Sequence, residues 1–281
     1  MKIGKYELKV ANSGFFGLDG GAMFGVVPKS LWQKTNPADD SNRIKLSTRH
    51  LILESDSRKI IIETGVGTKN DEKFKKIYDI DETHSLDKGL GAIGLKREDI
   101  TDVFLTHLHF DHTGGSTVLE NGKVTPAFPN AKYYIQKKQY DWAINPSDKD
   151  KASYINDNYI PLFKEGILKF TNGDEQFDDE IQFIETTGHT YGQQLVKISD
   201  GSDTVLFCAD LIPTVSHIPY PYIMGYDLQP LLTLEEKKKI LPLAVDQNWK
   251  LFFGHDPQTA FVTLKQTDKG IRESERFTQF E

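Results

Sequence analysis

The chain has 281 residues, 38% of them hydrophobic and 27% charged, which allows one large or two small domains with a substantial core. Its formal net charge of −7 argues against a nucleic-acid partner, because phosphate binding needs a clustered basic surface. Its one cysteine, Cys208, excludes an intrachain disulfide. The start of the chain lacks the apolar core of a signal peptide, and no stretch is apolar enough to span a bilayer. We therefore expect a cytoplasmic protein without membrane contact.

The first half of the chain predicts strands and a helix in succession. Alternating polar and apolar residues predict a first strand that ends near Val10, before a run of glycines. Two apolar runs joined by a polar turn predict a hairpin over 50–54 and 59–63. Helical periodicity covers 74–90, and a strand over 102–106 follows it.

The second half repeats this alternation. Strands are predicted over 132–136, 181–185, 194–198, 204–209 and 250–253. Helices are predicted over 138–143, 153–163 and 233–248, and after Asp256. Because no linker or repeat divides the chain, we expect a single domain over 1–281. Its fold class would be α/β, with two sheets packed face to face and helices on the outside.

Most of the histidines belong to one recurring pattern. Residues 106–112 read Thr-His-Leu-His-Phe-Asp-His, which puts three histidines and an aspartate within six residues. His189, Asp210 and His255 each follow a later predicted strand. Catalytic groups of layered α/β proteins lie on loops at strand ends, so we expect these side chains to converge at one edge. Four ionisable groups this close would be costly to bury without a partner, which predicts metal binding.

His107 and His109 form the start of a first predicted metal site. In an extended segment, residues i and i+2 point the same way, so both imidazoles can hold one ion. His189 would complete this site. Imidazole together with carboxylate favours zinc, with iron, manganese, cobalt and nickel as alternatives.

Asp111 and His112 lie beyond the strand, where the backbone turns, and can bind a second ion. His255 would complete this second site. Asp210 can bridge the two ions, because a carboxylate has two oxygens. We therefore expect two divalent ions with a hydroxide between them as the nucleophile, and Asp111 as the residue that accepts or relays a proton. The predicted chemistry is metal-assisted hydrolysis, with Asp111 and Asp210 as catalytic residues.

The run His-x-His-x-Asp-His at 107–112, with a distant His, Asp and His after it, resembles the signature of the metallo-β-lactamase superfamily. The resemblance extends from residue 51 to residue 256. It implies a four-layer αββα sandwich of two mixed sheets, with the metals at one edge. The segment 188–192 is similar to the family's Gly-His-Thr-Pro-Gly loop, with Tyr191 in place of proline.

Within this superfamily, the chain is most similar to the lactonase-related hydrolases, which include the N-acyl homoserine lactone lactonases. The resemblance rests on Asp210 as the bridging carboxylate, on Gly-His-Asp at 254–256, and on the segment 19–28, which is similar to a pocket-lining stretch of that branch. In such enzymes an apolar N-terminal wall receives the acyl chain of the substrate. The residues that this implies here are Met23, Phe24 and Trp32.

Two positions depart from the pattern of the lactonases. Those enzymes carry a tyrosine three residues after the bridging aspartate, where this chain has Pro213, and an aspartate after the second strand, where it has Glu63. The aromatic, proline-broken segment 215–226 follows Asp210, and we expect it to form a wall that faces the substrate. Its tyrosines could supply the missing hydroxyl: Tyr220, Tyr222 and Tyr226.

These observations predict a dinuclear metal hydrolase that opens a lactone or small ester, with acyl homoserine lactones among the candidate substrates. The alternative is a phosphotriesterase-like or thioester hydrolase of the same fold. A nuclease would need a basic surface, and an oxygen-reducing di-iron member would replace a histidine of the cluster, whereas His109 is present. The expected partner is a small molecule, and the resemblance suggests a homodimer.

Overall fold

Two seven-stranded sheets dominate the computed structural model, which describes residues 1–280. The first sheet has, in spatial order, β1 (Lys2–Ile3), β2 (Tyr6–Asp19), β3 (Arg43–Glu54), β4 (Lys59–Ile62), β5 (Asp102–Phe104), β8 (Lys132–Gln136) and β9 (Leu168–Thr171). The second has β10 (Glu175–Gln176), β11 (Ile181–Thr186), β12 (Gln193–Ser199), β13 (Thr204–Phe207), β14 (Lys250–Phe252), β15 (Phe261–Thr267) and β16 (Gly270–Phe277). A small hairpin joins β6 (Thr117–Glu120) to β7 (Lys123–Pro126).

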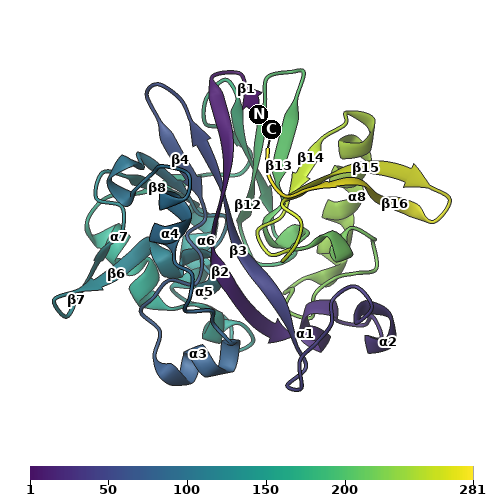
Figure 1. Ribbon diagram of the computed structural model, residues 1–281, viewed down its shortest axis with the longest axis horizontal. Helices are drawn as coiled ribbons and strands as arrows, with labels where there is room; N and C mark the ends of the chain where they lie inside the picture. Colours follow the sequence, from purple (N-terminus) through teal and green to yellow (C-terminus); the bar gives the residue numbers. More distant parts are fainter. Residues whose placement is uncertain (281) are drawn as a thin grey trace.

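Helices lie on both outer sides of the paired sheets, with α4, α6 and α7 on one side and α8 on the other (Figure 1). The longer helices are α3 (Glu72–Tyr78), α4 (Leu86–Gly91), α6 (Lys137–Ala143) and α8 (Pro230–Asp246). The shorter ones are α1 (Gly20–Phe24), α2 (Lys29–Trp32), α5 (Phe110–Thr113) and α7 (Ile160–Lys164). The predicted αββα sandwich of two mixed sheets is confirmed.

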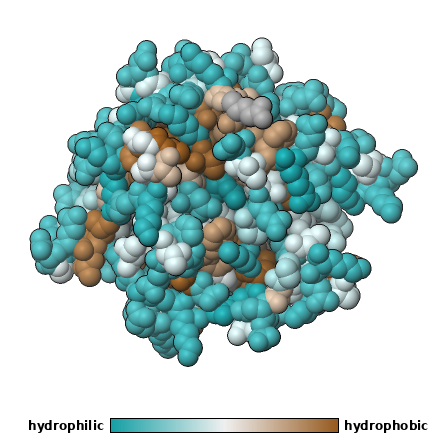
Figure 2. Space-filling view, viewed as in Figure 1, coloured by the Kyte–Doolittle hydropathy of each residue, from teal (hydrophilic) through white to brown (hydrophobic). Residues whose placement is uncertain are grey.

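The two-residue period of the strands divides the core into layers. Leu51 and Leu53 of β3 point into the core between the sheets, where they join residues of β12, β13 and β14. Ile52, between them, points outward into a second core beneath α4 and α6. Figure 2 shows that one outer face is mostly hydrophilic, with hydrophobic residues gathered in small areas. No helix in residues 1–280 is long and apolar enough to cross a membrane.

Two predicted boundaries in the first half were wrong. The first strand does not end at Val10 but continues to Asp19, because a bulge between Asn12 and Phe15 absorbs Gly14, whose φ is +131°. The helix predicted over 74–90 is two helices, α3 and α4. Asp79 ends α3 in the left-handed conformation, and Ser85 caps the start of α4 with its side chain.

Two predictions in the second half also need correction. Of the helix predicted over 153–163, only α7 is α-helical, and its first turn contains Pro161. The helix predicted after Asp256 is absent from the described chain, where β15 and β16 occupy 261–277. Phe261 of β15 pairs with Phe252 of β14, so the segment extends the second sheet instead of covering it.

Candidate metal centre

Three histidines converge at the ends of two strands. His107 and His109 lie in the loop after β5, and His189 lies in the loop after β11. Nδ1 of His109 is 3.1 Å from Nε2 of His107 and 3.2 Å from Nε2 of His189. All three side chains are buried. Three ring nitrogens that face one point cannot all find hydrogen-bond partners in one another. They can, however, all coordinate one metal ion through their lone pairs.

A second set of ligands lies beside the first. Asp111 and His112 belong to α5, and His255 follows β14. Nε2 of His112 is 3.1 Å from Nε2 of His255, and Oδ2 of Asp111 is 3.6 Å from each of these nitrogens. The arrangement offers two nitrogens and one oxygen to a second ion.

Asp210 lies between the two sets of ligands. Its Oδ2 is 3.4 Å from Nε2 of His189 and 3.5 Å from Nε2 of His112, while Oδ1 is 3.3 Å from Nε2 of His255. Within the described chain, this buried Oδ1 has no hydrogen-bond partner. An orphaned buried carboxylate oxygen between imidazole nitrogens fits a pair of bridged divalent ions.

The backbone of Ala209 adopts a φ of +44°, which a residue with a side chain rarely does. It immediately precedes Asp210 in a short 3-10 turn after β13. Such a conformation costs about 1–3 kcal/mol and persists where the surrounding structure enforces it. Here it turns the Asp210 side chain toward the histidines.

Outer carboxylates fix the orientation of the ligand histidines. Nδ1 of His112 is 2.7 Å from Oε1 of Glu63, and Nδ1 of His189 is 2.8 Å from Oδ1 of Asp227. A carboxylate only accepts, so each Nδ1–H donates and each Nε2 is left free to bind a metal. Thr233 donates to the second oxygen of Asp227 at 2.8 Å. Glu63, which stands where the lactonases have an aspartate, thus orients His112.

The remaining histidines are oriented by other groups. Nδ1 of His255 donates to the carbonyl of Ser47 at 2.9 Å. Nδ1 of His107 donates to Oγ1 of Thr106 at 3.0 Å, since that hydroxyl gives its own proton to Glu63. His109 differs, because its Nδ1 faces the cluster and its ring packs edge-on against Tyr154.

The electrostatics of the centre suit metal ligands. Burial, followed by the neighbouring imidazoles, holds the pKa of His107 and His109 well below its ordinary value. These rings are therefore neutral, as a ligand nitrogen must be. Burial alone would lower the pKa of His112, but the carboxylates of Glu63, Asp111 and Asp210 outweigh it and raise that pKa well above its ordinary value. A divalent ion would replace the proton that these carboxylates hold there.

Helix α5, which carries Asp111 and His112, and the glycines that follow it pack directly on the segment after β4. A Cβ atom on Gly114 would lie 1.8 Å from the carbonyl oxygen of Val66, and one on Gly67 would lie 2.2 Å from the carbonyl oxygen of Gly114. Thr64 adds two contacts, because its amide and its hydroxyl both donate to the carbonyl of His112, at 2.9 Å and 3.0 Å. The backbones touch with no side chain between them.

A cavity of about 310 Å³ opens over the metal ligands. Its floor contains His109, Asp111, His189, Asp210 and His255. Its apolar wall consists of Leu18, Ala22, Met23, Tyr78, Phe110, Met224 and Tyr226. Lys149, Asp150 and Ser153 give it a polar side. This cavity joins the chemistry of the ligands to an apolar surface.

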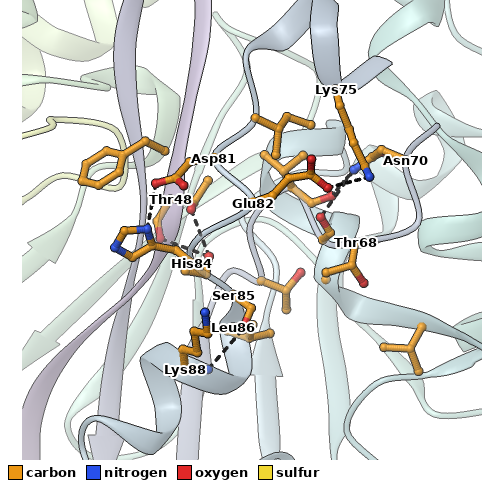
Figure 3. A pocket seen from close by; sticks show the side chains of 18 of the residues that line it. Thr48, Thr68, Asn70, Lys75, Asp81, Glu82, His84, Ser85, Leu86 and Lys88 are labelled. Atoms are coloured by element: carbon orange, nitrogen blue, oxygen red, sulfur yellow. Dashed lines mark hydrogen bonds and ion pairs between the residues drawn. The ribbon is translucent and has the colours of Figure 1, made fainter. Parts of the chain in front are cut away.

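Figure 3 shows residues that line a second cavity, of about 270 Å³. Polar side chains at its edge pair with one another, with Nδ1 of His84 2.7 Å from Oδ2 of Asp81 and Nζ of Lys75 2.6 Å from Oε1 of Glu82. None of the seven predicted ligands lines it. The cavity over the ligands is therefore the candidate active site.

Only part of the predicted substrate wall lines the active-site cavity. Met23 and Tyr226 do so. Phe24 and Trp32 do not; both are buried in the same apolar cluster as Met23, and their rings stack with centroids 5.3 Å apart. Tyr222 packs edge-on against Phe24 at 6.1 Å instead of facing the cavity.

Tyr220 also lies away from the cavity and packs against the core between the sheets. For these aromatic residues, the expectation of a substrate-facing position is corrected. A tightly packed second layer uses them because they are large and apolar, and a short helix such as α1 can present only one side to the cavity.

The wall segment is fixed to its surroundings by buried polar contacts. Nζ of Lys237, a fully buried group in α8, donates to the carbonyls of His217, Pro219 and Tyr222 at 2.6, 2.8 and 3.0 Å. Nε2 of His217 donates to the carbonyl of Met23 at 2.9 Å, which ties the segment to α1.

Asp227 and Lys237 were not predicted as parts of the site. No spacing links Asp227 to His189, 38 residues earlier, and Lys237 lies in a basic run that is typical of a solvent-exposed helix face.

Comparison with known proteins agrees with this geometry. The model of the metallo-beta-lactamase superfamily matches residues 50–255. An N-acyl homoserine lactonase from Bacillus cereus is 26% identical over 230 residues, which cover 76% of this chain and 83% of the lactonase. The structure of a probable metal-dependent hydrolase from Staphylococcus aureus superposes with a TM-score of 0.89 at 28% identity, and the superposition covers 99% of this chain and 100% of that one.

A further structure shows the same fold at lower identity. The dizinc quorum-quenching lactonase AidC, solved with a homoserine product, has a TM-score of 0.81 and 24% identity, with 99% of this chain and 97% of AidC covered. The predicted enzyme class, a metal-dependent hydrolase with lactonase relatives, is confirmed at this level. With a matching family model over most of its length and the ligand cluster in place, this chain belongs to the metallo-beta-lactamase superfamily.

Proposed function

We propose that this protein is a dinuclear metal hydrolase that opens a lactone or a related small ester. The observation that carries the proposal is the position of Asp210, whose two oxygens lie between two complete sets of ligands at the floor of an apolar cavity. Two divalent ions, most simply zinc, would lower the pKa of a water molecule and polarise the substrate carbonyl when bound.

The first set of residues would hold one ion and the second set the other. His107, His109 and His189 supply nitrogens to the first. The second ion would be held by one carboxylate oxygen and two ring nitrogens, from Asp111, His112 and His255. Asp111 also lines the cavity, so its carboxylate can accept a proton from water and pass it to the leaving oxygen. We retain it as the proton-transfer residue.

Tyr226 is the proposed replacement for the tyrosine that is missing at Pro213. Burial, followed by the charges of Asp19, Tyr78 and Asp111, raises the pKa of its phenol, so the hydroxyl stays protonated. Its hydroxyl makes no hydrogen bond to any other residue of the described chain, and its side chain lines the cavity. It can therefore donate to the carbonyl or ring oxygen of a substrate above the metal centre.

The relatives support a lactone as the substrate class. Lactonase relatives from Bacillus and Agrobacterium species are 26% and 28% identical to this chain. The apolar wall formed by Leu18, Met23 and Met224 suits the hydrocarbon part of such a substrate. We further propose that the enzyme is cytoplasmic and acts as a homodimer.

The test is a set of hydrolysis rates for purified protein of known metal content. The substrates are γ- and δ-lactones, acyl homoserine lactones, aryl esters, a phosphotriester and a thioester. A kcat/KM above about 10⁴ M⁻¹s⁻¹ on a lactone is expected. Strong turnover of the phosphotriester with weak turnover of every lactone would contradict the proposal.

The bridged centre has its own test in the variant Asp210→Asn. An amide has one acceptor oxygen where the carboxylate has two, so we expect the protein to lose metal and activity together. Metal content is measured by elemental analysis beside kcat. Full activity with one bound metal would exclude a bridged two-metal mechanism.

A further inference from the structure

A groove at the molecular surface adjoins the active-site cavity. This groove has a volume of about 520 Å³ and shares Leu18, Tyr78 and Tyr226 with the cavity over the metal ligands. Most of its lining comes from α3, the end of β2 and the start of β3, which lie together at one end of the molecule (Figure 1). A substrate chain that passes these three side chains would leave the metal centre and enter the groove.

One face of α3 lines the groove with cations. Lys73, Lys76 and Ile77 follow the i, i+3, i+4 spacing of a single helix face and all line the groove. The aromatic residues of α3 hold it in place, because Phe74 and Tyr78 pack on Phe110 with ring centroids 5.0 Å and 4.6 Å apart. Phe110 adjoins Asp111, so the metal centre and the helix have a fixed relation.

The two lysines of this face are free to meet a ligand. Within residues 1–280, neither Lys73 nor Lys76 forms an ion pair or a side-chain hydrogen bond, whereas Lys75 on the same helix pairs with Glu72 and Glu82 at 2.8 Å and 2.6 Å. The helix therefore directs its paired lysine away from the groove and its unpaired lysines into it.

The other charged groups of the groove are already engaged. The Arg43 guanidinium is 2.7 Å from Asp39 and donates to the carbonyl of Lys76 at 2.9 Å. Asp19 accepts from Asn42 and from the amide of Ala22, both at 2.8 Å. The hydrogen-bond partners of Asp19 are neutral, so it keeps its negative charge, and the charged side chains of the groove without an ion-pair partner are Lys73, Lys76 and Asp19. Their sum is one net positive charge, in a protein whose net charge is −7.

We propose that the groove binds the far end of the substrate and that this end carries a carboxylate. The substrate would be a lactone or ester with an apolar chain that passes Leu18 and Tyr78 and ends in an anionic group between Lys73 and Lys76. This inference rests on the proposed function and specifies its substrate class. Lys73 and Lys76 are then specificity-determining residues that do not touch the reacting bond.

The experiment compares two lactones that differ only in charge. One is a δ-lactone whose alkyl side chain ends in a carboxylate, and the other carries an uncharged primary amide in place of that carboxylate. Wild-type enzyme is expected to have a kcat/KM about five-fold higher for the carboxylate at low salt, mainly through KM, as two exposed charge contacts would give. The preference should shrink in 0.5 M NaCl because salt screens exposed charges.

The variant Lys73→Gln/Lys76→Gln should lose this preference and still hydrolyse the neutral lactone at the wild-type rate. The matched control is Lys123→Gln/Lys164→Gln, which removes the same charge from surface positions outside the groove lining. Equal rates on both lactones in the wild type, or a preference that survives in Lys73→Gln/Lys76→Gln, would overturn this inference alone. Failure to hydrolyse either lactone would overturn the proposed function and the inference with it.

Discussion

Replacement of Asp227 by asparagine isolates the electrostatic contribution of an outer carboxylate to the metal centre. The asparagine Oδ1 can still accept from Nδ1 of His189 at the observed 2.8 Å. Its amide group then meets the hydroxyl of Thr233, which is 2.8 Å from the second carboxylate oxygen and can turn to accept. Shape and hydrogen-bond number are kept, and only the negative charge is lost.

Loss of that charge makes Nε2 of His189 a weaker metal ligand. Outer-shell substitutions typically cost 10–100-fold in metal affinity, which is about 1.4–2.7 kcal/mol. We expect the affinity for the first ion to fall by this amount in Asp227→Asn. The affinity for the second ion should stay as in the wild type, because Glu63 orients its ligand His112. Competition with a chromogenic chelator measures both affinities.

The variant Thr233→Val serves as the control, because it removes the hydroxyl that supports Asp227 and keeps the charge. Its effect on affinity should be smaller than that of Asp227→Asn. Unchanged affinity of the first ion in Asp227→Asn, or equal weakening of both ions, would refute the reasoning.

Three other predictions follow from contacts of the wall. Tyr226→Phe should lower kcat/KM on lactones by at least about ten-fold, as loss of one donor to the substrate oxygen would, whereas Tyr222→Phe should change it little; equal effects in a steady-state assay would contradict the assignment. Lys237→Met leaves three carbonyls without their donor and should lower the free energy of unfolding, measured in urea, by about 2–4 kcal/mol. An unchanged urea midpoint would show that these three contacts do not stabilise the fold. Burial lowers the pKa of His217 to about 4, against about 6.5 in the unfolded chain. The unfolded chain therefore binds the extra proton between these values, and stability falls as pH drops from 6.5 to 4, by at most about 1.4 kcal/mol per unit. His217→Gln should flatten this slope in urea unfolding at several pH values, and an identical slope would exclude His217 as its source.

The sequence predicted the ligand cluster well because the information is local. In residues 107–112 the ligand types, their spacing and the preceding strand all lie within a few positions, and strand ends then bring His189, Asp210 and His255 to the same edge. The layered fold followed from the same alternation of strands and helices, since each apolar face must be covered.

The substrate wall could not be predicted in the same way. Whether Trp32 or Met23 reaches the cavity depends on how α1 and α2 pack against the segment 215–227, and both residues are equally apolar in sequence. The side chain of Trp32 packs so closely on Gly20 that a Cβ there would lie 2.4 Å from it, a contact between residues with no periodic relation. Asp227 was missed because it reaches His189 from an irregular segment.

The direct contact between the backbones of Gly67 and Gly114 has a mechanical consequence. With no flexible side chain as a spacer, α5 with Asp111 and His112 would move together with the segment after β4. Two ligands of the second ion would then be held rigidly against the sheet. The site of the first ion also needs His189, which lies in a separate loop. Adaptation to new substrates would therefore come more easily from the wall and the groove than from α5 and the glycines that follow it, where even one added methyl group would displace the ligands.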